Sequence, residues 1–287
     1  MHTLIEWLLQ PVSYAFMQRG LAAAVLVGVV CAVVGTYVVL RGMAFFGDAL
    51  AHTILPGVAL GYLVNGGARE ALFWWALGAA ILSALGIGVV SRNKRIKEDT
   101  AIGVIFAGLF ALGIAMISTV RSYAVDLSHF LFGDVLGVSA QSLWTTAVFG
   151  GLVLVTVVLF YKEFLTLSFD PVLAATLRLP VGLLNNLLLV LIAVTIAVSL
   201  QTVGVALMVA MLVTPAATAY LLTYRLPVMM ALAAVIAMLS GVVGLYLSYY
   251  LSIASGAAIV LTATVIFFGV FLLAPRRGLI WGMRASS

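Results

Sequence analysis

Long apolar runs dominate the chain, and short polar connectors separate them. A bilayer core of about 30 Å needs about 20 mostly apolar residues per helical span. The runs that meet this length lie approximately at residues 20–40, 43–64, 71–91, 101–119, 141–161, 183–200, 204–223, 228–251 and 257–274. They are continuously apolar and lack the alternation of a membrane β-barrel. The pattern therefore predicts an all-α, polytopic membrane helix bundle of eight to nine transmembrane helices, with eight if residues 43–64 do not cross fully.

Composition supports this prediction and excludes several classes of protein. Of 287 residues, 65% are apolar and 8% are charged, whereas soluble domains carry about 25% charged residues. Soluble enzymes, secreted domains and disordered chains are excluded, and we expect residues 1–287 to form one transmembrane domain. Residues 1–18 lack the pattern of a cleavable signal peptide, so we expect an N-terminal interfacial segment there. The single cysteine, Cys31, excludes an internal disulfide and a zinc finger.

The net charge of +5 is explained by the distribution of basic residues between the two sides of the membrane. With nine alternating spans, one side receives Arg41, Arg92, Lys94, Arg95, Lys97, Lys162, Arg178, Arg225, Arg276, Arg277 and Arg284. The other side receives only Arg19, Arg69 and Arg121. Because cytoplasmic loops collect Lys and Arg, this asymmetry predicts an outside N-terminus and a cytoplasmic C-terminus. Nucleic acid is not needed to explain the charge.

One connector on the basic side predicts a short helix. Residues 168–180 read SFDPVLAATLRLP, in which Asp170 can cap the helix, Pro171 suits its first position and Pro180 can stop it. This segment is too short to span a membrane. It is the only cytoplasmic feature large enough to receive a partner protein, and Val172, Leu173 and Leu177 are its candidate apolar anchors.

The connector at residues 126–138 on the other side is also apolar and contains His129. It suits either a re-entrant helix or a surface helix lying against the bundle. His129 stands close to Asp126 and Asp134. That cluster is compatible with capture of an arriving cation, but a solvated or docking surface is the more frequent reason for such residues.

Asp48 and His52 are the main candidates for chemistry within the membrane. They lie four positions apart in GMAFFGDALAHTILPGVALGYL, so a helix places them on one face, one turn apart. An ionisable side chain at membrane depth costs at least about 2.5 kcal/mol and needs compensation. A carboxylate and an imidazole together suit Mn²⁺, Fe²⁺ or Zn²⁺. The spacing alone also allows an internal salt bridge between the two side chains, or helix capping by Asp48.

Two ligands do not complete the coordination of such an ion. A second copy of the chain, related by a two-fold axis, would supply another carboxylate and another imidazole. Pro56 and Gly57 would loosen the helix beyond the pair, where a pathway must open. Gly57 and Gly61 also form a small-xxx-small pair, which predicts the close approach of a neighbouring helix.

The stretch VLRGMAFFGDALAHTILPGVALGYL resembles the metal-type ABC-3 permeases, the membrane subunits of bacterial manganese, zinc and iron ABC importers. The resemblance continues in the same order through KEDTAIGVIFAGLFALG, HFLFGDVLGVS, SFDP, VGVALMVAMLVTPAATAYLLT and SGVVGLYLSYYLSIASGAAIVL, and so covers nearly the whole chain. Two positions depart from the usual family pattern. Val172 stands where many relatives carry an acidic residue, and Ala257 stands where a proline is common.

The resemblance implies a permease subunit of an ATP-driven importer for Mn, Zn or Fe, in the bacterial cytoplasmic membrane. It implies that Asp48 and His52 line the translocation site at the axis of a homodimer. It also implies that the helix at residues 168–180, including Asp170 and Pro171, docks on a cytoplasmic ATP-binding subunit. An extracytoplasmic metal-binding protein would deliver the ion.

The chain lacks a G-x-x-x-x-G-K-[ST] motif, so we expect no ATPase activity, no catalytic residues and no cofactor of its own. ATP would be bound by the partner subunit, and the metal would be cargo. The alternative is an ATP-independent secondary transporter that uses Asp48 and His52 for proton-coupled transport. An intramembrane enzyme is disfavoured, because H-E-x-x-H and G-x-S-x-G motifs are absent and Asp48 has no second intramembrane acid as a partner.

Overall fold

The structure is a computed structural model that describes residues 10–65, 69–91, 98–118 and 135–274. Within these ranges it contains helices and no β-strand. The helices are η1 (Pro11–Ser13, a 3-10 helix), α2 (Ala15–Leu40), α3 (Ala44–Thr53), α4 (Leu55–Asn65), α5 (Arg69–Ser91), α6 (Glu98–Ser118), α8 (Ala140–Leu159), α9 (Tyr161–Phe169), α10 (Pro171–Thr176), α11 (Val181–Val203), α12 (Val205–Leu222), α13 (Leu226–Leu251) and α14 (Ser255–Leu273). Counting α3 and α4 together, 9 helical segments of the described chain are long and apolar enough to cross a membrane. The prediction of an all-α, polytopic membrane bundle is therefore confirmed.

The span expected at residues 43–64 is not one continuous helix. It is divided into α3 and α4, with Ile54 outside the helical pattern between them. The cause is Pro56, which has no N–H group to donate to the carbonyl of His52 one turn earlier. The two halves together still reach the length of a span, at 22 residues. The described residues therefore keep nine candidate spans, and the second of these has a break.

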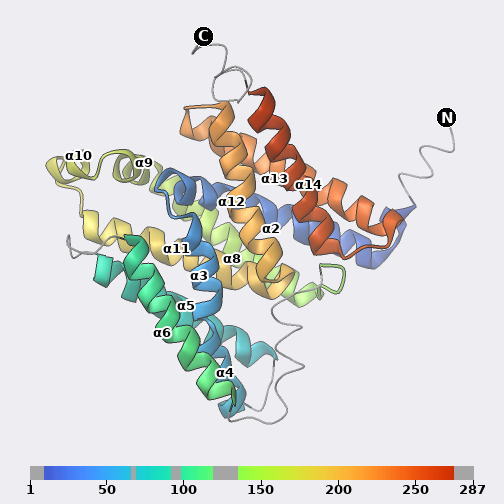
Figure 1. The fold of residues 1–287 in the computed structure, drawn as a ribbon, viewed down its shortest axis with the longest axis horizontal. Coiled ribbons are helices and arrows are strands. Elements are labelled where there is room, and N and C mark those ends of the chain that lie inside the picture. Colours follow the sequence, from blue (N-terminus) through green and yellow to red (C-terminus); the bar gives the residue numbers. More distant parts are fainter. Residues whose placement is uncertain (1–9, 66–68, 92–97, 119–134, 275–287) are drawn as a thin grey trace.

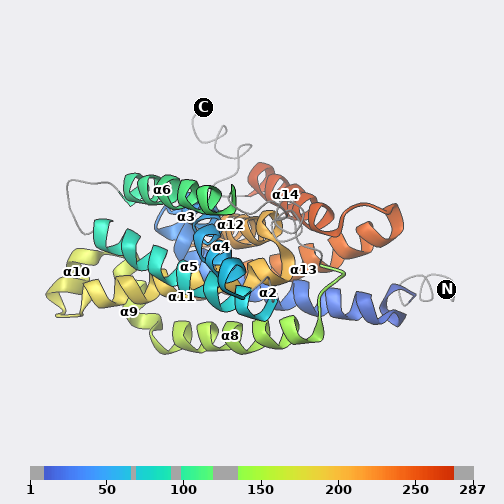
Figure 2. The same cartoon turned by 90° about the horizontal axis from the view of Figure 1, so that it is seen from below.

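Helices α2 and α3 lie in the interior of the bundle (Figures 1 and 2). Helix α2 packs against α8, α11, α12 and α13, and α3 packs against α5, α6, α11 and α12. Figure 2 shows α6 and α14 along one margin of the molecule and α8 along the opposite margin. Only 17% of the α6 span, 17% of the α14 span and 22% of the α8 span are buried within the chain, whereas 67% of the α2 span is buried. The outer helices thus leave wide apolar faces for lipid or for another chain.

The small-xxx-small pair in α4 admits α5 at close range, as the sequence predicts. A Cβ atom added to Gly57 would lie 2.5 Å from both the Trp75 carbonyl oxygen and the Ala79 Cβ atom. A Cβ atom at Gly61 would lie 2.8 Å from Cδ1 of Trp75. Real Cβ contacts are longer than this, so the packing of α4 on α5 depends on both glycines.

Several connectors that carry basic residues meet at one end of the bundle. A cavity of about 160 Å³ at this end is lined by Leu40, Phe169, Tyr220, Thr223, Tyr224, Leu226 and Met229. Leu40 directly precedes Arg41, and Tyr224 directly precedes Arg225. Arg41 also donates from Nη2 to Oδ1 of Asn185 on α11, at 2.5 Å. The described connectors thus bring Arg41 and Arg225 to the same end of the bundle.

Some predicted features lie outside the described residues. These are residues 1–9 of the interfacial segment, residues 126–134 of the outer connector with His129, and the basic positions Arg92, Lys94, Arg95, Lys97, Arg121, Arg276, Arg277 and Arg284. The described part of the N-terminal segment is helical from Ala15, so α2 begins five residues before the span expected at residue 20. The described end of the outer connector, residues 135–138, forms a bend and turn before α8.

Candidate metal site and surface helix

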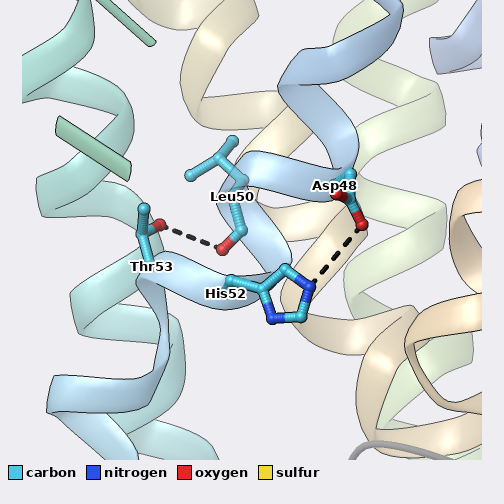
Figure 3. Close-up of polar contacts among 4 residues, drawn as sticks. All are labelled: Asp48, Leu50, His52 and Thr53. Carbon is cyan, nitrogen blue, oxygen red and sulfur yellow. Dashed lines mark hydrogen bonds and ion pairs between the residues drawn. The ribbon is translucent and has the colours of Figure 1, made fainter. Parts of the chain in front are cut away.

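Asp48 and His52 lie on one face of α3 and point toward the same space (Figure 3). Oδ1 of Asp48 is 3.7 Å from Nε2 of His52, and the side chains are 41% and 27% exposed, respectively. The opposite face of the helix is apolar and fully buried, as Phe46 and Leu50 show. Packing of α3 into the bundle therefore directs the two polar side chains out of the core of the single chain.

The end of α3 keeps the backbone near the pair compact. Figure 3 shows the hydroxyl of Thr53 donating to the carbonyl oxygen of Leu50, at 3.0 Å. This bond satisfies a carbonyl in the last turn, as polar side chains often do where proline interrupts a membrane helix. The pair thus stands directly before a helix break, which is the place where the backbone of this span is least regular.

The distance between Asp48 and His52 is informative about the possible chemistry. At 3.7 Å the two atoms are too far apart for a good hydrogen bond. Two ligands of a tetrahedral zinc ion lie about 3.4 Å apart, since each bond is about 2.1 Å long. A small side-chain rotation would therefore admit a divalent ion between them. The same distance also meets the criterion for an ion pair with protonated His52, so the geometry accommodates both interpretations.

A single chain does not supply a complete coordination shell in its described part. No group of three or more His, Cys, Asp or Glu side chains comes together among the residues that the structure describes. Because divalent transition metals take four to six ligands, a metal at Asp48 and His52 needs ligands from outside this set. The exposure of the pair leaves room for them.

Aromatic neighbours of His52 were missed by the sequence reasoning. The rings of Phe110 and Phe106, both on α6, have centroids 5.5 and 6.0 Å from the imidazole centroid. Atom Nδ1 of His52 is buried and makes no hydrogen bond with the described residues. In the sequence these two residues appear only as phenylalanines four positions apart within an apolar segment. Such a pair cannot be assigned to His52 until the packing of α6 on α3 is known.

The short helix predicted in residues 168–180 is present as α10. Oδ1 of Asp170 accepts hydrogen bonds from the backbone N–H groups of Val172 and Leu173, each at 2.9 Å. Pro171 is the first residue of the helix, where its missing N–H group costs nothing. The predicted cap and start are therefore confirmed.

The predicted end of this helix is wrong. Helix α10 stops at Thr176, before Pro180, which instead caps α11. Arg178 adopts a left-handed backbone with φ of 57°, and its N–H group donates to the carbonyl oxygen of Ala175 at 3.0 Å. The Leu179 N–H group donates to the Ala174 carbonyl oxygen at 3.1 Å. These two bonds form a Schellman motif, which terminates the helix without help from proline.

Helix α10 and its C-cap residue Leu177 carry exposed apolar side chains on a well-anchored support. Val172, Leu173 and Leu177 are 74%, 49% and 59% exposed. The preceding helix α9 is held in the bundle by Phe164, which is fully buried and meets the Tyr37 ring edge to face at 5.8 Å between centroids. Figure 1 shows α9 and α10 extending from one side of the bundle. The apolar surface of α10 is thus fixed to α2 through α9.

Comparison with known proteins gives consistent matches over nearly the whole chain. Residues 13–274 match the profile of the family described as ABC 3 transport family. The chain is 47% identical, over 98% of its length and 97% of the relative, to the manganese transport system membrane protein MntC of Listeria monocytogenes. It is 39% identical, over 92% of its length and 96% of the relative, to the probable iron transport system membrane protein of Haemophilus influenzae. It is also similar to the structure described as PsaBC from Streptococcus pneumoniae in complex with Fab, with a TM-score of 0.81 and 38% identity, covering 96% of this chain and 97% of that one.

Proposed function

Because the chain belongs to the ABC 3 transport family, we propose that it is the permease subunit of an ATP-driven importer for a divalent transition metal. Manganese is the first candidate cargo, because the relative at 47% identity is named as a manganese transport protein. Iron remains a candidate through the relative at 39% identity. Zinc remains one because carboxylate and imidazole ligands also suit it.

The observation that carries this proposal is the Asp48–His52 pair on the open face of α3. Both side chains are accessible, and their nearest O and N atoms are 3.7 Å apart. Asp48 supplies negative charge that offsets the charge of the cation, and His52 supplies a nitrogen ligand that favours transition metals over Mg²⁺ and Ca²⁺. The ion would pass between them without a permanent cofactor in the chain.

The proposed working unit is a homodimer in which the two pairs face a shared axis. Two copies would place two carboxylates and two imidazoles around one ion, which meets the number of ligands that such ions require. The absence of a third His, Cys, Asp or Glu side chain beside the pair in the described part of one chain supports this arrangement. The site must bind weakly enough to release its ion, since conduction fails when binding is too tight.

Energy would enter through the surface of α10. The exposed side chains of Val172, Leu173 and the C-cap residue Leu177 have the apolar character of interface anchors, and Asp170 fixes the start of the helix. A separate cytoplasmic subunit would bind ATP, because the sequence holds no P-loop motif. An extracytoplasmic protein would deliver the metal on the other side. The chain itself would not be an enzyme.

The proposed orientation places α10 and the C-terminus in the cytoplasm and the N-terminus outside, in a bacterial cytoplasmic membrane. The convergence of the Arg41 and Arg225 connectors at one end of the bundle supports this orientation. We further propose that residues 1–287 act as one permease domain, with residues 1–18 at the interface. The family match over residues 13–274 supports a single functional unit. It also disfavours the alternative of an ATP-independent secondary transporter.

Metal uptake by cells tests the proposed function. Cells that produce the permease with its cognate ATPase and binding protein should accumulate Mn²⁺, Fe²⁺ or Zn²⁺ above cells that lack only the permease. A variant of the ATPase that cannot hydrolyse ATP should abolish the difference. If each of the three metals accumulated to the same level in cells with and without the permease, the proposal would be contradicted. Accumulation that depends on the permease but not on the ATPase would favour secondary transport.

A further inference from the structure

The imidazole of His52 lies against two phenyl rings of α6, Phe106 and Phe110, which we call the aromatic wall. The Phe110 ring meets the imidazole nearly edge to face, at 73° between planes and 5.5 Å between centroids. The Phe106 ring lies at 53° and 6.0 Å. The two phenyl rings stack on each other at 23° and 5.6 Å, so they form one surface. This surface belongs to the contact between α3 and α6.

The two nitrogens of His52 have different surroundings. Nε2 faces the carboxylate of Asp48 at 3.7 Å. Nδ1 is buried and has no hydrogen-bond partner among the described residues. A metal-binding histidine normally donates its second N–H group to a carboxylate, a carbonyl or a water molecule, which fixes the ring and raises its basicity. In this chain, aromatic rings stand beside the imidazole instead.

Aromatic rings can orient an imidazole without providing a strong acceptor. Their faces carry partial negative charge, so edge-to-face contacts are favoured and an N–H group directed at a face makes a weak bond. Packing against Phe110 and Phe106 would therefore restrict the rotamer of His52. It would not raise the basicity of the imidazole as a carboxylate acceptor does. The result would be an oriented but weak ligand, which suits a site that must release its ion.

Resting on the proposed function, we propose that Phe106 and Phe110 are positioning residues of the transport site. They hold the imidazole of His52 by ring packing, in place of the usual hydrogen-bond acceptor, so that Nε2 stays beside the Asp48 carboxylate. The aromatic wall acts only through His52 and does not contact the ion. Loss of the ring face should therefore weaken the nitrogen ligand while the carboxylate ligand remains.

Binding of Mn²⁺ to the purified permease in lipid nanodiscs tests this proposal. Free Mn²⁺ is quantified from its electron paramagnetic resonance signal, and pulsed measurements detect coupling between bound Mn²⁺ and an imidazole nitrogen. In Phe110→Leu we expect the affinity to fall by up to about tenfold, the lower end of the effect of losing a hydrogen-bonded supporting group, because the rings orient the imidazole without raising its basicity. We also expect the nitrogen coupling to disappear. Phe110→Tyr keeps the ring face and should restore both signals.

Phe149→Leu is the matched control, because Phe149 on α8 makes edge-to-face contacts with Phe73 and Trp74 and none with His52. It should bind Mn²⁺ as the wild type does. Thermal unfolding checks each variant, and Phe106→Leu replaces Phe110→Leu if the latter does not fold.

Three outcomes would overturn the inference. Unchanged affinity and coupling in Phe110→Leu, with binding lost in Asp48→Asn, would refute the positioning role and leave the proposed function standing. Equal losses in the Leu and Tyr variants would show that the ring face is not what matters. Absence of Mn²⁺ binding by the wild type at millimolar concentration would overturn the positioning role for Mn²⁺, whereas the proposed function is tested separately by cell uptake of Mn²⁺, Fe²⁺ and Zn²⁺.

Discussion

Replacement of Leu173 by Asp should detach the ATPase from the permease without unfolding it. Leu173 is 49% exposed in the free chain, so docking can bury about half of its side chain. Full burial of a leucine contributes about 1.5–3 kcal/mol, so this half is worth about 1 kcal/mol. An aspartate in the same groove also loses hydration without gaining a partner. For a partly covered carboxylate we take this penalty as about 2 kcal/mol, below the cost of full burial.

The total of about 3 kcal/mol corresponds to a roughly 100-fold weaker complex, since each 1.4 kcal/mol changes an affinity tenfold. The assay is co-purification through a tag on the permease, followed by titration of purified ATPase onto permease in nanodiscs. Leu173→Met keeps the apolar volume and serves as the matched control. A Leu173→Asp complex of wild-type affinity and full coupling would refute the assignment of α10 as the docking surface.

Three further predictions concern helix capping and packing. Asp170→Ala removes the acceptor for the first N–H groups of α10 and should destabilise this helix by about 1 kcal/mol. Amide exchange should be faster, and ATPase binding weaker, than in the control variant Asp170→Asn; equal exchange in both variants would refute the capping role. Gly57→Val places a Cβ atom 2.5 Å from the Trp75 carbonyl oxygen and should lower the thermal unfolding temperature. The control is Gly78→Val, where a Cβ atom meets nothing within 4 Å; equal unfolding temperatures of the two variants would contradict the close packing of α4 on α5. Thr146→Val removes the 2.6 Å hydrogen bond between the hydroxyl groups of Thr146 on α8 and Thr202 on α11. The free energy of unfolding should fall by about 0.6 kcal/mol while metal uptake stays normal; a loss of uptake would give this contact a role in transport.

Much of the fold follows from apolar run length alone. The nine predicted spans correspond to nine helical candidates in the described chain, because about 20 apolar residues have few alternatives in a bilayer. Helix ends were harder to place. Spans expected at 183–200 and 204–223 are in fact α11 and α12, separated only by Gly204 with φ of 81°. Glycine adopts this positive φ without a steric penalty, so one residue can separate two helices, and apolar run length does not reveal this.

The candidate site was only partly visible in the sequence. Helical periodicity places Asp48 and His52 on one face, and the structure has them there. The capping role of Asp170 was also predicted, because it depends on residues two and three positions away. The contact of His52 with Phe106 and Phe110 was not, since it depends on how α6 packs against α3. Likewise, the left-handed Arg178 ends α10 at a position where the sequence shows no glycine.

The most direct test of the central claim is Mn²⁺ uptake by the double variant Asp48→Asn with His52→Gln. Both substitutions nearly keep side-chain volume, and together they remove both charges of a possible ion pair. If Asp48 and His52 only form an ion pair with each other at their 3.7 Å separation, the double variant should fold and transport normally. If the pair forms the metal pathway, uptake of radiolabelled Mn²⁺ should fall to background while the complex with the ATPase stays intact. Uptake at the wild-type rate would contradict the account.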